Sequence, residues 1–254
     1  MKLVNPVRET LRDGGVCIGT FLNFPSPELV EICALAGFDF VLIDAEHGPI
    51  TPESCYTMIL AAEARGIPTL ARIGEHDRQV ILKYLDIGIG GVVVPQVNDA
   101  ATARQMVQAL RYAPLGFRGV AGGRTYDYGQ GAPAVTLIPK LNERILSSVQ
   151  FEHIDALDNI DEILATPDLD VLFVGPNDLA QSMGYPGQPL HPEVQAIIDR
   201  VVAAARGGPV ALGTVAFDPE STKRQIERGF RLIAGNLPSL IAGAARKYLD
   251  AARA

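Results

Sequence analysis

Polar side chains follow several apolar runs of the chain, at points where buried strands of a parallel sheet would end. The run Phe40–Ile43 leads into Asp44, and His47 follows three residues later. A carboxylate at this spacing can accept a hydrogen bond from one ring nitrogen of the histidine and leave the other nitrogen as a base. The sequence predicts an acid–base pair here, and the alternative is a turn with a capping aspartate and a solvated Glu–His pair.

A single arginine closes the next apolar run. Arg72 lies near the end of Thr69–Ile73, a segment that is otherwise apolar apart from its first residue. A buried guanidinium needs an anionic partner, which either the protein or a ligand can supply. Arg72 is therefore a candidate anion-binding residue, with a structural ion pair as the alternative.

Two carboxylates follow two later runs, Ile145–Phe151 and Val171–Val174. Glu152 comes directly after the first run, and Asp178 comes shortly after the second. Carboxylates that converge at strand ends repel each other unless a cation or a shared proton lies between them. Oxygen ligands without a Cys or His cluster favour Mg²⁺, followed by Mn²⁺. The alternative for Asp178 is that it caps a short helix beginning at Leu179.

Other chemistries receive less support from the sequence. The five lysines all lie away from expected strand ends, so a Schiff base lacks its nucleophile, and neither a GxSxG elbow nor a Cys–His arrangement is present. The segment GVAGGR could form an anion-binding nest beside Arg118 and Arg124, although no Walker pattern follows it. We expect surface or capping roles for His76, His153 and His191.

The elements that must position these residues alternate between apolar runs and amphipathic stretches. The runs are rich in Val, Ile, Leu and Phe without polar alternation, which is typical of strands buried on both faces of a parallel sheet. The predicted strands are Val16–Leu22, Phe40–Ile43, Thr69–Ile73, Gly91–Val94, Ile145–Phe151, Val171–Val174, Val210–Val215 and Leu232–Ala234.

Helical patterns with capping residues separate these strands. The predicted helices begin after Ser26, Thr51, 76–77 and 98–99, and further helices cover about 156–165, 192–205, 219–228 and 238–252. Repeated strand–helix units predict an α/β fold, a single (β/α)₈ barrel domain over residues 1–254. The main competitor, an open doubly wound sheet, would favour a GxGxxG turn after the first strand, where the chain reads LNFPS. The Gly-rich segment Tyr112–Gly131 interrupts the alternation of strands and helices and indicates a functional or mobile connection.

Composition narrows the class of protein. The 254 residues are 48% hydrophobic and 20% charged, with a net charge of −7, which excludes disorder and argues against nucleic-acid binding. Three cysteines without a CxxC pair predict reduced core thiols and a cytoplasmic location. We expect neither a signal peptide nor a membrane span, because no apolar run approaches about 20 residues.

The motifs IDAEHG, GFRG and GPNDL occur in this order along the chain, together with GTFLNFPSPELVEICALAGFDFVLIDAEHGP, KYLDIGIGGVVVPQV and VQFE. Over nearly its whole length the chain resembles the metal-dependent (class II) pyruvate aldolases of the 4-hydroxy-2-oxo-acid aldolase (HpcH/HpaI) family. The resemblance implies a (β/α)₈ barrel that assembles from dimers into a homohexamer, with the C-terminal helix exchanged between subunits. An apolar stripe from Leu237 to Leu249 is consistent with such an interface.

The resemblance also implies roles for the candidate residues. Glu152 and Asp178 would bind a divalent metal, Mg²⁺ first and Mn²⁺ or Co²⁺ as further options, with no organic cofactor. Arg72 would contact the C2 oxygen of the oxo acid, and His47, supported by Asp44, would act as the acid–base.

Three further residues are assigned by the same comparison. Asp86, in KYLDIG, would reach the site of a neighbouring subunit. Gln150 would lie near the metal, and Asn177 would contact the substrate where the family often has Ala or Ser. Phe151 and Asn236 also depart from the family pattern, as does the RTYDYGQG loop, so the sequence leaves the substrate aldehyde open. Its pocket is expected to include Asn23, the Arg118–Tyr128 loop and a neighbouring subunit.

The implied reaction is the reversible cleavage of a 4-hydroxy-2-oxo acid into an aldehyde and pyruvate, or a related 2-oxo acid such as hydroxypyruvate. The partners would then be these small molecules and further copies of the chain, with neither nucleic acid nor membrane. One alternative is a CoA-thioester lyase of the citramalyl or malyl type, which needs an Arg- and Lys-rich site that this short chain hardly accommodates. The other alternative is a barrel protein without catalytic activity.

Overall fold

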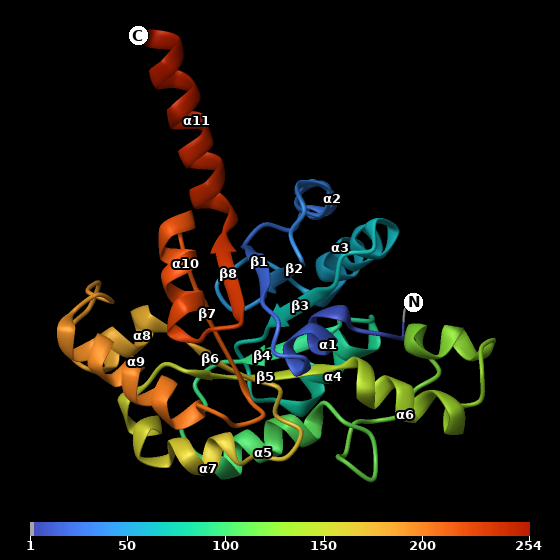
Figure 1. The fold of residues 1–254 in the computed structure, drawn as a ribbon. Helices are drawn as coiled ribbons and strands as arrows, with labels where there is room; N and C mark the ends of the chain where they lie inside the picture. The colour runs from blue at the N-terminus through green and yellow to red at the C-terminus, as the bar shows by residue number, and fades with distance from the viewer. Residues whose placement is uncertain (1–2) are drawn as a thin grey trace.

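The protein is described by a computed structural model for residues 3–254, and its eight strands close into one parallel barrel (Figure 1). Each strand pairs with the next along the chain, and β8 pairs with β1. The strands are β1 Cys17–Leu22, β2 Phe40–Asp44, β3 Thr69–Arg72, β4 Gly91–Val94, β5 Leu146–Phe151, β6 Val171–Val174, β7 Ala211–Val215 and β8 Leu232–Asn236. The predicted (β/α)₈ barrel is confirmed, with strand ends within two residues of the predicted ones.

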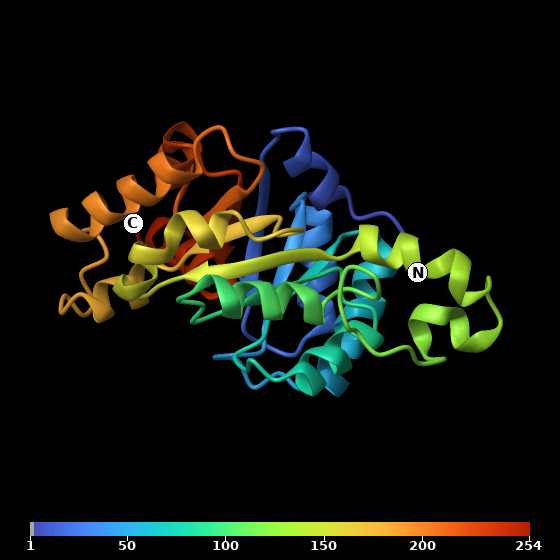
Figure 2. The same cartoon turned by 90° about the horizontal axis from the view of Figure 1, so that it is seen from below.

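Helices follow the strands and surround the barrel (Figure 2). The α-helices are α1 Pro6–Arg12, α2 Pro27–Ala36, α3 Pro52–Arg65, α4 Arg78–Asp86, α5 Ala100–Ala109, α6 Ala134–Arg144, α7 Ile160–Leu164, α8 Pro176–Ser182, α9 Pro192–Ala205, α10 Pro219–Arg228 and α11 Leu237–Arg253. Two short 3₁₀ helices, η1 Arg124–Gly129 and η2 Ile154–Asn159, complete the set.

Local sequence signals fix most helix ends. The side chains of Ser26, Thr51, Asp77 and Asp99 accept hydrogen bonds from the first-turn N–H groups of α2 to α5, which are otherwise without partners. Gly37 ends α2 with a φ of 92°, a left-handed conformation that glycine adopts at little cost. The predicted starts of these helices are thus confirmed.

Three helices, α1, α6 and α8, were not among the predicted ones. α6 has Pro139 at its sixth position and follows a glycine-rich segment, and both features usually interrupt a helix. The helix predicted over about 156–165 is instead split between η2 and α7.

The barrel interior is packed rather than open. Large side chains from opposite strands fill it, and the rings of Phe21 and Phe173 meet edge to face with centroids 6.1 Å apart. Each of these two phenylalanines lies one residue before the end of its strand, β1 or β6, so they form the floor beneath the carboxyl end of the barrel.

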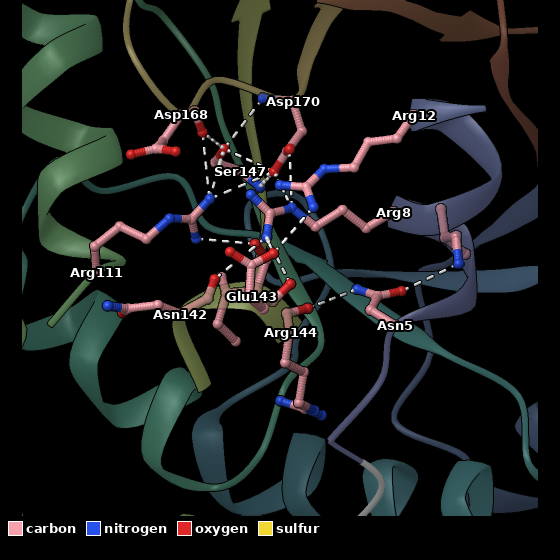
Figure 3. Close-up of polar contacts among 12 residues, drawn as sticks. Asn5, Arg8, Arg12, Arg111, Asn142, Glu143, Arg144, Ser147, Asp168 and Asp170 are labelled. Carbon is pink, nitrogen blue, oxygen red and sulfur yellow. Dashed lines mark hydrogen bonds and ion pairs between the residues drawn. The ribbon is translucent and has the colours of Figure 1, made fainter. Parts of the chain in front are cut away.

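The amino end of the barrel is closed by an ionic cluster that ties α1 to β5 and β6 (Figure 3). Arg8 Nε lies 2.9 Å from both Asp170 carboxylate oxygens, and Arg111 Nη2 lies 3.4 Å from Asp170 Oδ2. Arg111 also donates to the Ile145 carbonyl at 2.9 Å, and burial lowers its pKa to about 10. In this cluster two buried arginines share one carboxylate, which is a structural arrangement.

The three cysteines are free and buried, as predicted for core thiols. Burial raises the pKa of Cys17 and Cys33 to about 11 and that of Cys55 to about 12. These thiols therefore remain protonated and unreactive near neutral pH.

The last helix projects away from the barrel (Figure 1). Within α11 only Leu237 is buried, whereas Leu240, Ile241 and Leu249 are 39%, 48% and 40% exposed. Asn236 caps this helix by accepting a bond from Ser239 N, a task that an aspartate could perform equally. Among residues 3–254 neither this helix nor any other combines the length and apolar character that a membrane crossing requires.

Candidate active site

Asp44 and Arg72 are neighbours at the carboxyl ends of β2 and β3. The parallel register places them side by side, and the guanidinium donates from Nε and Nη2 to the two carboxylate oxygens at 3.0 and 2.8 Å. The guanidinium also lies 4.8 Å from the centre of the Phe21 ring. Arg72 is thus held on three sides in a fixed orientation, as predicted for a buried arginine with an anionic partner.

Asp44 does not orient the ring of His47. Its Oδ1 accepts from the backbone N–H groups of Glu46 and His47 at 3.3 and 3.2 Å, and its Oδ2 accepts from Asn23 Nδ2 at 2.7 Å. The prediction of a direct Asp44–imidazole bond is therefore wrong, because the carboxylate is already used by Arg72 and by the turn. The His47 side chain is 61% exposed. It lies at the carboxyl end of the barrel, which we call the mouth, and can meet a ligand there.

Glycine at position 48 makes this turn possible. A Cβ at Gly48 would lie 2.4 Å from the Asp44 carbonyl oxygen and 3.0 Å from that of Asn23. The IDAEHG segment therefore folds back at the end of β2, and Nε2 of His47 lies 3.8 Å from Oε2 of Glu46.

Glu152 is buried at the end of β5, with only 2% of its surface exposed. Its Oε1 accepts from the backbone N–H of Gln96 at 2.7 Å, and its Oε2 accepts from Gln150 Nε2. The other amide atom of Gln150, Oε1, is buried with no hydrogen-bond partner among the described residues. Gln150 therefore contacts the carboxylate that is the predicted metal ligand, and it leaves a hydrogen-bond acceptor without a partner beside it.

Asp178 lies in the first turn of α8, which begins at Pro176 with Gly175 as its N-cap. The alternative in which Asp178 caps a helix starting at Leu179 is therefore wrong. A Cβ at Gly175 would lie 2.9 Å from Glu152 Oε2, so this glycine leaves room for the neighbouring carboxylate. Asn177 is exposed beside Asp178 at the same end of the barrel.

The electrostatics of the mouth are dominated by negative charge. Burial, with smaller contributions from the charges of Asp178 and Glu46, raises the pKa of Glu152 to about 7, while the Gln96 N–H and Arg72 act in the opposite direction. The group of oxygen donors and this uncompensated charge fit a hard divalent cation. Among residues 3–254, no group of three or more His, Cys, Asp or Glu side chains is arranged for a metal.

Two residues of the site were missed by the sequence argument. Glu46 Oε2 lies 3.1 Å from Arg72 Nε, although the sequence suggested only a solvated side chain. The period-2 alternation of a strand, continued past Asp44, would have placed it on the inner face. Gln96 contributes through its backbone with a φ of 55°, for which the sequence carries no signal.

Asp86 and the Gly-rich segment lie at the opposite end of the barrel. Asp86 ends α4, where it accepts a bond from Arg118 Nη2 at 3.0 Å, and Arg124 pairs with Glu63 at the end of α3. These positions precede strands, so the fold places them at the amino ends. The Arg118–Tyr128 loop does not line the mouth of its own barrel, and its arginines are paired with acids rather than arranged as an anion nest.

Comparisons with known proteins agree with the barrel fold and show its family. A sequence model described as HpcH/HpaI aldolase/citrate lyase matches residues 17–238. A 2-keto-3-deoxy-L-rhamnonate aldolase of Salmonella gallinarum is 35% identical over 94% of this chain and 89% of its own length. A crystal structure of an HpcH/HpaI aldolase/citrate lyase family protein from Burkholderia cenocepacia has a TM-score of 0.93 at 31% identity, over 99% of this chain and 100% of that one.

A more distant structure shares the fold alone. It is a citrate lyase beta subunit from M. tuberculosis complexed with oxaloacetate and magnesium, at 17% identity and a TM-score of 0.55 over 91% of this chain and 95% of that one.

The raised pKa of Glu152 predicts a pH-dependent stability of the metal-free protein. A carboxyl whose folded pKa is about 7 rather than 4.5 stabilises the fold at low pH, and this stability is lost as the pH rises through 7. Glu152→Gln removes the charge, so at pH 8 the metal-free variant should melt several degrees above wild type, with a shrinking difference toward pH 5. Differential scanning calorimetry in chelator measures this.

The control is Glu31→Gln, which changes an exposed carboxyl paired with Arg65. It should move the melting temperature equally little at both pH values. A Glu152→Gln protein that is no more stable than wild type at pH 8 would contradict the assigned burial cost.

Proposed function

Because the chain belongs to the HpcH/HpaI aldolase/citrate lyase family, we propose that its barrel mouth is the active site of an aldolase that cleaves a 4-hydroxy-2-oxo acid into pyruvate and an aldehyde. The observation that carries this proposal is the buried Arg72, fixed by Asp44 beside the carboxylates Glu46 and Glu152. One oriented cation in a site of excess negative charge suits a reaction that develops an oxyanion.

The carbon–carbon bond breaks so that its electron pair passes to the pyruvate fragment. As the C3–C4 bond opens, charge collects on the C2 oxygen of the resulting enolate, and we assign Arg72 to this oxygen. Asp44 accepts from Nε and from one N–H of Nη2, so we assign Nη1, which has no hydrogen bond among the described residues, as the donor to substrate. The bidentate pair keeps this donor in place before the charge forms.

His47 is assigned to the C4 hydroxyl. The proton of this hydroxyl goes to the imidazole, the C4–O bond becomes the aldehyde carbonyl, and the enolate then takes a proton at C3 to become pyruvate. The exposed ring at the mouth permits this exchange. In the reverse direction the same groups add pyruvate, or a related donor such as hydroxypyruvate, to an aldehyde.

Glu152 and Asp178 are assigned as the ligands of a divalent cation, Mg²⁺ first, with Mn²⁺ and Co²⁺ as alternatives. Such a cation supplies a Lewis acid that withdraws charge from the substrate's carboxylate and 2-oxo oxygen. Gln150, through its unpartnered Oε1, and the exposed Asn177 are placed to contact the substrate or water beside it.

The aldolase is favoured over a CoA-thioester lyase by the comparisons. The matched aldolase is 35% identical, whereas the citrate lyase subunit shares the fold at 17% identity. A barrel protein without catalytic activity is disfavoured, because Asp44, Arg72 and Glu152 are buried together at the mouth. A purely structural barrel would not need buried charges at this position.

Metal dependence tests the proposed activity. The protein should release pyruvate from 2-keto-3-deoxy-L-rhamnonate or another 4-hydroxy-2-oxo acid, measured with coupled lactate dehydrogenase, and chelation should abolish release until Mg²⁺ or Mn²⁺ is restored. Glu152→Gln and Asp178→Asn should be inactive, and the exposed-site control Asp155→Asn should be unchanged. Full activity after chelation would contradict the proposal.

Arg72 and His47 should be separable by a second reaction. Decarboxylation of oxaloacetate also produces pyruvate enolate, but oxaloacetate has no C4 hydroxyl. Arg72→Ala should lower both reactions about 10²–10³-fold, the usual loss for one oxyanion donor. His47→Ala should lower aldol cleavage about 10²–10⁴-fold and largely spare decarboxylation.

Equal losses of both reactions in His47→Ala, with metal binding intact, would show that the histidine does something other than move the hydroxyl proton. Steady-state kinetics of the two reactions on the same preparations provide the comparison.

We also propose that the active protein is a homo-oligomer, a hexamer built from dimers, in which α11 packs on another copy. The exposed apolar side chains Leu240, Ile241 and Leu249 of this projecting helix support the proposal (Figure 1). Asp86 would then act at the site of a neighbouring subunit, since it lies at the far end of its own barrel.

Light scattering on a sizing column should therefore give a mass of several chains. The pair Leu240→Glu and Ile241→Glu should shift the mass toward that of one chain, because it places charges on the apolar face. Lys247→Glu, on the same helix, is the charge-change control. A wild-type mass of one chain at micromolar concentration would refute the oligomer.

A further inference from the structure

The peptide group between Pro95 and Gln96 is held at both of its polar ends. Its carbonyl oxygen lies 2.6 Å from Nε2 of His76, and its N–H donates to Glu152 Oε1 at 2.7 Å. His76 comes from the loop between β3 and α4, the peptide follows β4, and Glu152 ends β5. One peptide thus connects three consecutive units of the barrel at its carboxyl end.

This connection requires an unfavourable backbone conformation. Gln96 has a φ of 55°, in the left-handed region that non-glycine residues seldom adopt. Such conformations are energetically unfavourable and persist where the surroundings enforce them, often at functional sites. The buried neighbours Pro95 and Val97 anchor the peptide on both sides, and the left-handed turn directs the N–H to Glu152.

His76 is itself held in place by its neighbour along the chain. Asp77 caps α4 by accepting bonds from Gln79 N and Val80 N at 2.6 and 3.0 Å. Because the loop is fixed at this point, the imidazole meets the Pro95 carbonyl. The oxygen can only accept a hydrogen bond, so Nε2 is the donor.

We propose that His76 is a positioning residue for Glu152 and acts through the Pro95–Gln96 peptide. Its hydrogen bond holds the carbonyl and polarises the peptide, which strengthens the N–H bond to Glu152 Oε1 at the opposite end. Oε1 is thereby fixed, and the carboxylate has a single orientation in which to meet a cation. The inference rests on the proposed role of Glu152 as a metal ligand, and it gives a function to a histidine for which the sequence suggested a surface or capping role.

Binding of Mn²⁺ to the substrate-free protein, measured by calorimetry or by the loss of free-ion electron spin resonance signal, tests the inference directly. His76→Ala should weaken Mn²⁺ binding about 10–100-fold, the usual effect of losing a group that orients a metal ligand. His76→Gln, whose amide can donate to the same carbonyl, should recover much of the affinity. His191→Ala, which removes a histidine that accepts from Glu193 N at the start of α9, is the matched control and should bind as wild type does.

A pair of substitutions at position 96 separates the backbone from the side chain. Gln96→Gly keeps the N–H and adopts a positive φ readily, so it should bind Mn²⁺ nearly as wild type does. Gln96→Val also keeps the N–H but disfavours the left-handed conformation, so it should lose affinity as His76→Ala does. Equal losses in both variants would assign the effect to the glutamine side chain and overturn the inference.

Glu152→Gln distinguishes the possible failures. If it abolishes Mn²⁺ binding while His76→Ala and Gln96→Val bind normally, the positioning role is refuted and the metal site stands. If Glu152→Gln binds as wild type does, the ligand assignment fails and the inference fails with it. Kinetics add a further check, since saturating Mn²⁺ should restore the kcat of His76→Ala but leave a raised KM for the metal. If His76→Ala folds poorly, the Mn²⁺ affinities of Gln96→Gly and Gln96→Val test the inference without it.

Discussion

The site depends on one imbalance of charge, which is that a single buried guanidinium faces several carboxylates at the mouth of the barrel. Arg72 is paired with Asp44 and also contacts Glu46, so it cannot neutralise Glu152 as well. Burial and the remaining negative charge raise the pKa of Glu152 to about 7. We expect a divalent cation to relieve this repulsion, and its positive charge would then also stabilise the oxyanion of the proposed aldol cleavage.

Both ends of the barrel contain buried arginines and carboxylates, but these groups are satisfied to different degrees. At the amino end, Arg8 and Arg111 share Asp170, and they also donate to backbone carbonyls and to the Ser147 hydroxyl (Figure 3). That cluster is complete and stabilises the closure of the barrel. At the carboxyl end, the orphaned Oε1 of Gln150 and the raised pKa of Glu152 leave interactions to be made with a ligand.

Much of the site is oriented by backbone groups rather than by other side chains. The N–H groups of Glu46 and His47 bind Asp44, and the N–H of Gln96 binds Glu152. Such contacts require unusual local conformations, a close turn at Gly48 and a left-handed Gln96. In the role that we propose for His76, the rigid Pro95–Gln96 peptide connects this histidine of the β3–α4 loop to Glu152, so that holding one end of the peptide orients the carboxylate at the other end.

The sequence by itself determined the barrel, most strand and helix ends, and the residues that meet at the mouth. Apolar runs and capping residues are local signals, and parallel strands bring their carboxyl ends to one edge, so Asp44, Arg72, Gln150 and Glu152 could be placed together. Only the tertiary structure decided what these groups bind. Asp44 binds Arg72 instead of the ring of His47, Glu46 joins the site, and the Pro95–Gln96 peptide bridges His76 and Glu152. These outcomes depend on distances between strands and on one left-handed residue, and neither is encoded in the spacing of residue types along the chain.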